Sequence, residues 1–146
     1  VAPLSLPRVE RAILEAYKSD NIKLKASAIY AMGRNCSPDW INYAISELSS
    51  PLAELRYEAA GACGELGEEA AVPYLIEVAD EDDMDVRIAA IVALGKIGGD
   101  EVQEYLQSCL KDESEAIREA AEQALDDIDV MQDPGSIPWF DTRRPE

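Results

Sequence analysis

Residues 86–98, which read VRIAAIVALGKIG, decide the fold of this chain. Their apolar side chains recur at the i, i+4, i+7, i+8 and i+11 spacing of a helix with one buried stripe. Those side chains are Val86, Ala90, Ala93, Leu94 and Ile97. Gly98 then supplies the left-handed residue at which such a helix ends. The same period returns from Val102 to Leu110 and predicts a second helix there. Residues 86–98 and 102–110 are therefore expected to form a pair of antiparallel helices.

The pattern repeats along the chain with a period of 31 residues. When the sequence is written in rows of 31 residues, equivalent positions fall into columns, and one column is basic, one is alanine and one is glycine. The columns are Lys25, Arg56, Arg87 and Arg118; Ala28, Ala59, Ala90 and Ala121; and Gly33, Gly64 and Gly95. Residues 8–18 align with the second helix of each pair, so the chain is expected to begin with a second helix. At the other end, the last row contains only a first helix. An internal repeat of this length predicts an all-α solenoid, a right-handed α-α superhelix of about eight helices.

A family resemblance supports this architecture. Residues 86–98 resemble the first helix of the HEAT-like repeats of phycobilin lyase subunits, and residues 70–75 (AAVPYL) resemble the start of their second helix. The resemblance covers roughly residues 8–130 and implies a HEAT-repeat solenoid. We therefore expect a HEAT-like repeat domain at 1–131, the C-terminal part of a longer array. We expect an extended Pro-rich tail at 132–146, which either caps the last helix or offers a binding motif.

The charge of the chain narrows the kind of partner. The formal net charge is −17, and residues 38–132 carry five bases against 24 acids. Such a field repels phosphate backbones and anionic lipid, so we predict neither nucleic-acid nor membrane binding. It favours a basic protein partner, and the more basic residues 1–37 permit weak head-to-tail self-association. Three cysteines that match no disulfide or zinc pattern favour the cytoplasm.

The second helices carry the predicted binding site. A tyrosine recurs in each of them beside a buried column, together with nearby glutamates. The candidate residues are Tyr43, Tyr74, Tyr105, Glu47, Glu77, Glu81 and Glu104. Because second helices are expected to line the concave face, these residues predict an acidic, tyrosine-striped groove. The alternative is that the tyrosines fill the seam between helices.

Two other polar features have structural explanations. A cation in the first turn of a helix opposes the helix dipole, so we predict that the Lys25/Arg56/Arg87/Arg118 column forms ion pairs between loops and helices. We name Asp80–Asp85 as the partner region for Arg87, and Glu113 or Glu115 for Arg118. The acidic run itself lacks the glycine and glutamate positions of a calcium-binding loop, which favours a solvated loop with capping carboxylates.

The predicted function is that of an interaction scaffold, not an enzyme. The chain contains no histidine, so it cannot build the His–Glu metal sites of the HEAT-repeat hydroxylase that modifies deoxyhypusine, nor a Ser–His or Cys–His pair. We predict no metal and no cofactor, and a basic or extended protein segment bound on a concave acidic face. The alternative is a phycobilin lyase-like subunit that handles a chromophore, although the middle repeats offer few cations for its propionates.

Overall fold

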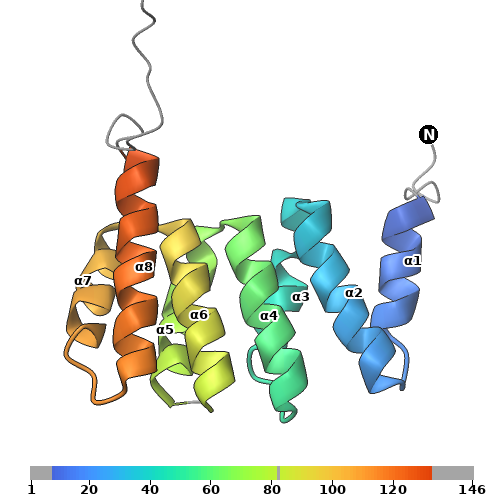
Figure 1. Ribbon diagram of the computed structural model, residues 1–146. Helices are drawn as coiled ribbons and strands as arrows, with labels where there is room; N and C mark the ends of the chain where they lie inside the picture. The colour runs from blue at the N-terminus through green and yellow to red at the C-terminus, as the bar shows by residue number, and fades with distance from the viewer. Residues whose placement is uncertain (1–7, 82, 133–146) are drawn as a thin grey trace, which may run out of the picture.

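The computed structural model describes residues 8–81 and 83–132, and these form a two-layered helical array (Figure 1). The bounds of its helices are α1 Arg8–Tyr17, α2 Ile22–Asn35, α3 Ile41–Glu47, α4 Ala53–Leu66, α5 Val72–Glu81, α6 Met84–Ile97, α7 Asp100–Cys109 and α8 Glu115–Gln132. Short 3₁₀ turns at Pro38–Trp40 and Glu69–Ala71 precede α3 and α5. The predicted all-α solenoid of eight helices is confirmed within these residues. The proposed tail at 133–146 lies outside them.

The 31-residue period is visible in the helix starts, because α2, α4, α6 and α8 begin at residues 22, 53, 84 and 115. We call these four helices the A layer and α1, α3, α5 and α7 the B layer. In Figure 1 the A helices stand side by side in front, with α3, α5 and α7 behind them. The sequence columns thus correspond to equivalent positions in space.

Alanine and aliphatic side chains form one continuous core between the layers. The column that contains Ala59 is buried along the array, and the column that contains Leu94 is buried except at Leu125. Leu75 and Leu106 are buried on the B-layer side of the same core. The small alanines let the helices approach closely, and the branched side chains fill the space between the layers. None of the helices in this part of the chain combines the length and apolarity needed to cross a membrane.

The glycine column sets the spacing of the A helices. A Cβ atom built on Gly33, Gly64 or Gly95 would lie 2.9 Å from the Cα atom of the alanine in the next A helix. Real Cβ atoms do not approach so closely, so only glycine allows this spacing. Contacts between neighbouring B helices are far fewer than those between neighbouring A helices.

Each repeat is therefore a wedge whose narrow side is the A layer, and stacking such wedges bends the array toward that layer. We infer that the A layer lines the concave side. The sequence analysis placed the concave face on the second helices, which are the B helices, and this placement is wrong. The error arose because the glycine column was interpreted only as a repeat marker, not as the point of closest helix approach.

The basic column joins loops to helices, as predicted, although its partners differ from those expected. Arg56, Arg87 and Arg118 donate to the backbone carbonyls of Ser50 at 2.8 Å, Ala79 at 2.7 Å and Asp112 at 2.7 Å, respectively. Arg87 also reaches the Asp112 carboxylate of the following loop at 3.2 Å, not the acidic run before it. In that run, Asp83 accepts from the Val86 amide at 2.9 Å and caps α6. The arginines thus satisfy backbone carbonyls in the last turn of the preceding B helix or in the loop after it. Arg118 also donates to the Glu113 carbonyl at 3.1 Å, so it contacts this expected partner through the backbone.

Replacing Arg87 with alanine is expected to lower the free energy of unfolding by about 1.5–3 kcal/mol, because the Ala79 carbonyl loses a charged donor. Thermal and urea unfolding measure this loss. The guanidinium lies on the loop side of the array and away from the A-layer surface, so ligand binding there should not change. An unchanged unfolding midpoint would show that the basic column contributes nothing to stability.

Candidate functional site

Seven residues were predicted from the sequence to bind a partner. They lie on α3, α5 and α7 of the B layer, but their environments differ. Tyr74, Glu77 and Glu104 are exposed, whereas Tyr43 and Tyr105 are half-buried. Glu81 ends α5, and its side chain is outside the described part of the structure. These residues therefore do not form a uniformly exposed stripe.

A compact cluster contains two of the seven, Tyr43 and Glu47. The Tyr43 ring packs edge-on against Tyr17 with 5.3 Å between ring centroids. Glu47 is buried, accepts a hydrogen bond from the Tyr17 hydroxyl and lies 3.4 Å from the Lys25 ammonium. Burial and the bond to Glu47 both raise the pKa of the Tyr17 hydroxyl. This network fixes α1 against α2 and α3, which is a packing role.

Tyr105 has a comparable environment at the other end of the array. Its ring packs against the main core, and burial raises the pKa of its hydroxyl. Burial likewise raises the pKa of the neighbouring Cys109 thiol. Only Tyr74, Glu77 and Glu104 of the described candidates thus have the exposure that a binding surface needs. Partner binding by the full set stays a prediction.

A concave surface lies on the A layer, across α2, α4 and α6. Three adjoining hollows of about 410, 360 and 140 Å³ share lining residues there. We call this surface the tyrosine groove. Its principal lining residues are Tyr30, Tyr57, Glu58, Asp85, Ile88 and Val92. Tyr30 and Tyr57 are 58% and 48% exposed, so their rings are available to a ligand.

Gly61 explains why the groove is open. In the 31-residue alignment Gly61 stands between Tyr30 and Val92, at the outward position of α4. A Cβ atom built on Gly61 would meet nothing within 4 Å, in contrast to the packed glycine at Gly64. Helix packing therefore does not require glycine at this position, and the side chains of Tyr30 and Val92 line the same hollow as Gly61.

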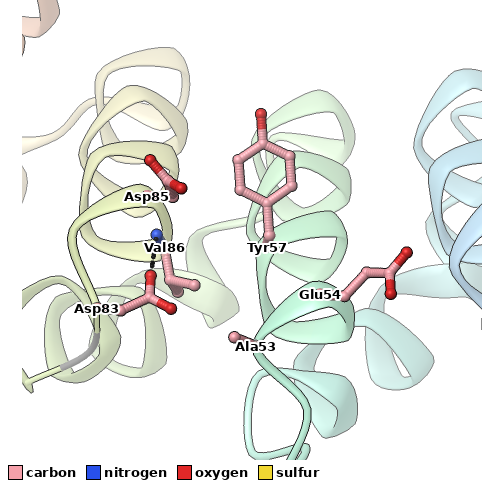
Figure 2. Close-up of a pocket in the computed structure, with 6 residues that line it drawn as sticks. All are labelled: Ala53, Glu54, Tyr57, Asp83, Asp85 and Val86. Carbon is pink, nitrogen blue, oxygen red and sulfur yellow. Dashed lines mark hydrogen bonds between the residues drawn. The ribbon is translucent and has the colours of Figure 1, made fainter.

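Carboxylates form one end of the groove. Figure 2 shows Asp83 and Asp85 at the start of α6, facing the side of α4 from which Tyr57 projects, while Glu54 extends away from them. Glu54 lies 3.6 Å from the Lys23 ammonium, an exposed pair that contributes little. Burial and the charge of Glu54 raise the pKa of Glu58, deeper in the groove. A cation at this end would relieve that repulsion.

Aromatic rings beside carboxylates suit an amine or guanidinium ligand. A cation above an exposed ring is attracted by about 0.5–1 kcal/mol, and nearby carboxylates add to this attraction. The groove was not predicted from the sequence, because the 31-residue repeat emphasises aromatic residues that are in register with one another. Tyr30 and Tyr57 occupy different columns, and only the packing of three helices brings them to one surface. The available signal was Gly61, a glycine outside the regular glycine column.

The fold and this surface define an α-solenoid with a tyrosine-lined groove on its A layer. The model of the family described as HEAT repeats matches residues 9–85 and 41–126. The chain therefore belongs to the HEAT-repeat family, and the HEAT-like assignment made from the sequence is confirmed.

Two curated relatives and two solved structures are similar to the chain. Deoxyhypusine hydroxylase of Eremothecium gossypii is 36% identical over 99 residues, which are 66% of this chain and 31% of that protein. The Neurospora crassa deoxyhypusine hydroxylase is 34% identical over 110 residues, covering 73% of this chain and 34% of the relative. The chain thus spans about a third of the length of these relatives.

The structural matches concern the fold alone. Human deoxyhypusine hydroxylase in complex with glycerol has a TM-score of 0.73 at 24% identity, covering 92% of this chain and 48% of that one. The CpcE–CpcF complex of phycocyanin lyase from Nostoc has a TM-score of 0.57 at 20% identity, covering 92% of this chain and 71% of that one. Both are helical arrays of the same kind.

The prediction of a non-enzymatic interaction scaffold is wrong, because the curated relatives are enzymes. The chromophore-handling alternative belonged to the same prediction and is likewise not supported by those relatives. The error has a physical origin. The lack of histidine limits which metal ligands this chain can supply, but it does not by itself exclude an enzyme.

Proposed function

We propose that the protein is an enzyme of the deoxyhypusine hydroxylase type, in which this chain holds the amine-bearing substrate in the tyrosine groove. The observation that carries the proposal is the 34–36% identity to two such enzymes over 99–110 residues. The chemistry of the groove supports it independently. Deoxyhypusine carries amines, which are cationic near neutral pH, and the groove combines exposed rings with carboxylates.

The geometry indicates a role for each part of the groove. Tyr57 lines both larger hollows, so its ring can cover the methylene chain and the charge of an amine side chain. Asp85 lines the same two hollows from α6 and supplies a carboxylate at the rim. Ile88 and Val92 offer an apolar wall for the alkyl portion.

A His–Glu metal site does not fit the residues of this chain. The sequence contains no histidine, and residues 8–81 and 83–132 include no group of three or more potential metal-ligating side chains. We therefore assign substrate binding and orientation to this chain and derive no catalytic step from its residues.

A binding measurement tests the proposal. A fluorescent peptide bearing deoxyhypusine should bind the protein about tenfold more tightly than the same peptide with its amines acetylated, because acetylation removes the cation. Asp85→Asn should remove much of this preference. Glu104→Gln is the matched control, since it neutralises an exposed carboxylate of the B layer.

Equal affinity for the two peptides would overturn the proposal. Loss of the preference in Glu104→Gln but not in Asp85→Asn would move the site to the B layer. Mass spectrometry of the same mixtures, in air with a reductant, checks the assigned role. A peptide that gained an oxygen atom with this chain alone would show that the chain also performs the chemistry.

A further inference from the structure

The tyrosine groove has a second end with a different charge. Arg34, Glu65 and Lys96 lie there, in the last turns of α2, α4 and α6, around the hollow of about 140 Å³. The Lys96 ammonium lies 2.7 Å from the Glu65 carboxylate, and this bond, with Arg34 nearby, lowers the pKa of Glu65. Two cations therefore share one carboxylate at this end of the groove.

The contrast with the opposite end follows from the register of the repeats. Glu54 and Asp85 occupy one column near the helix starts, whereas Arg34, Glu65 and Lys96 occupy another near the helix ends. Glu58, which also borders the small hollow, lies two turns closer to the acidic end on α4. The groove is thus acidic at one end, aromatic and aliphatic in the middle, and positive at the other.

The length of the groove sets a spacing for its ligand. From Asp85 to Lys96 the chain of α6 advances 11 residues, which is about 16 Å at the rise of an α-helix. Arg34 lies on α2, two A helices away from α6, which adds a lateral offset of about 16–20 Å at ordinary helix spacing. Asp85 and Arg34 are therefore about 23–26 Å apart, and about seven residues of an extended peptide, at about 3.3 Å each, span this distance. The rings of Tyr30 and Tyr57 lie between the two ends.

We infer that the groove binds an extended protein segment in which the amine-bearing residue and an acidic residue lie about seven positions apart. The amine occupies the Asp85 end and the acid faces Arg34. The first contact rests on the proposed function, whereas the second is new. The middle of the segment lies over the two tyrosines and Val92. Opposite charges at the two ends fix the orientation of the segment in the groove and select against uniformly basic sequences.

Paired peptides test this inference. Both carry the amine-bearing residue, and one has aspartate about seven positions away where the other has asparagine. The aspartate peptide should bind about twofold to fivefold more tightly, the range of an exposed ion pair. The difference should vanish in Arg34→Gln and reverse in Arg34→Glu. Lys111→Gln, which removes an exposed cation at the end of α7, is the control and should retain it.

A third peptide with aspartate two positions away should show no gain, because it cannot reach Arg34 from the Asp85 end. The inference is overturned if aspartate and asparagine peptides bind equally, or if Arg34→Gln leaves their difference intact. Those results would leave the preference for the free amine unaffected. Loss of the amine preference itself would instead overturn the proposed function, so the two failures are distinguishable.

Discussion

Replacing Gly64 with valine is expected to lower the free energy of unfolding by about 3 kcal/mol or more, because the new side chain must displace a neighbouring helix. A Cβ atom at this position would lie 2.9 Å from the Ala93 Cα atom and 3.0 Å from its Cβ atom. Both are atoms of the packed interface between α4 and α6, not the end of a flexible side chain. For a chain of this size the melting temperature should fall by about 6–12 °C.

Gly61→Val is the matched control, since it places the same side chain three residues earlier in the same helix. The Cβ atom of residue 61 would meet open space, and valine has a slightly better helix propensity than glycine. Its stability should therefore be unchanged or slightly higher. Equal destabilisation by the two substitutions would show that the glycine column does not set the spacing of the A helices.

Replacing Tyr57 with alanine should weaken binding of the deoxyhypusine-bearing peptide by about tenfold or more. The ring lines both larger hollows of the tyrosine groove, and tyrosines in such positions are frequent binding hot spots worth about 2 kcal/mol. The side chain is 48% exposed, so its removal should affect the fold little. Calorimetric titration measures the affinity, and circular dichroism checks the fold.

Tyr74→Ala provides the comparison, because Tyr74 is 47% exposed but lies on α5 in the B layer. The substitution removes the same amount of aromatic surface from the other side of the array. Binding should be retained. If Tyr74→Ala weakened binding and Tyr57→Ala did not, the ligand site would be on the B layer, where the sequence analysis placed it.

The architecture was predictable because it depends on local periodicity. The columns through Ala90 and Leu94 predict the buried stripe of the first helices. The A helices begin 31 residues apart, as the repeat predicts. Helix ends were equally local: α6 ends at Gly98, as predicted, and this glycine has a positive φ of 76°. Such features follow from a few neighbouring residues and need no knowledge of tertiary packing.

The candidate site was less predictable because it depends on the direction in which the array bends. That direction follows from contacts between helices that are 31 residues apart, such as Gly64 with Ala93. A sequence column shows that a glycine recurs but not how close the helices come. For the same reason the repeated tyrosines of the B layer drew attention, whereas Tyr30 and Tyr57 are not in register. Their association appears only when α2, α4 and α6 are packed.

The function was mispredicted because the absence of histidine was taken to exclude an enzyme. The absence of histidine bears only on the His–Glu metal ligands that this chain could supply. It has no bearing on substrate binding, for which carboxylates and aromatic rings suffice. Localisation, self-association and the exclusion of nucleic acid remain predictions from charge and cysteine content.

The central claim is that the A-layer groove holds the amine-bearing segment, and backbone chemical-shift mapping tests it most directly. On titration of ¹⁵N-labelled protein with the deoxyhypusine-bearing peptide, the largest changes should fall at Tyr30, at Tyr57–Gly61 and at Asp85–Val92. The acetylated peptide should produce much smaller changes at the same concentration. Changes confined to α5 and α7, or identical responses to both peptides, would contradict the claim.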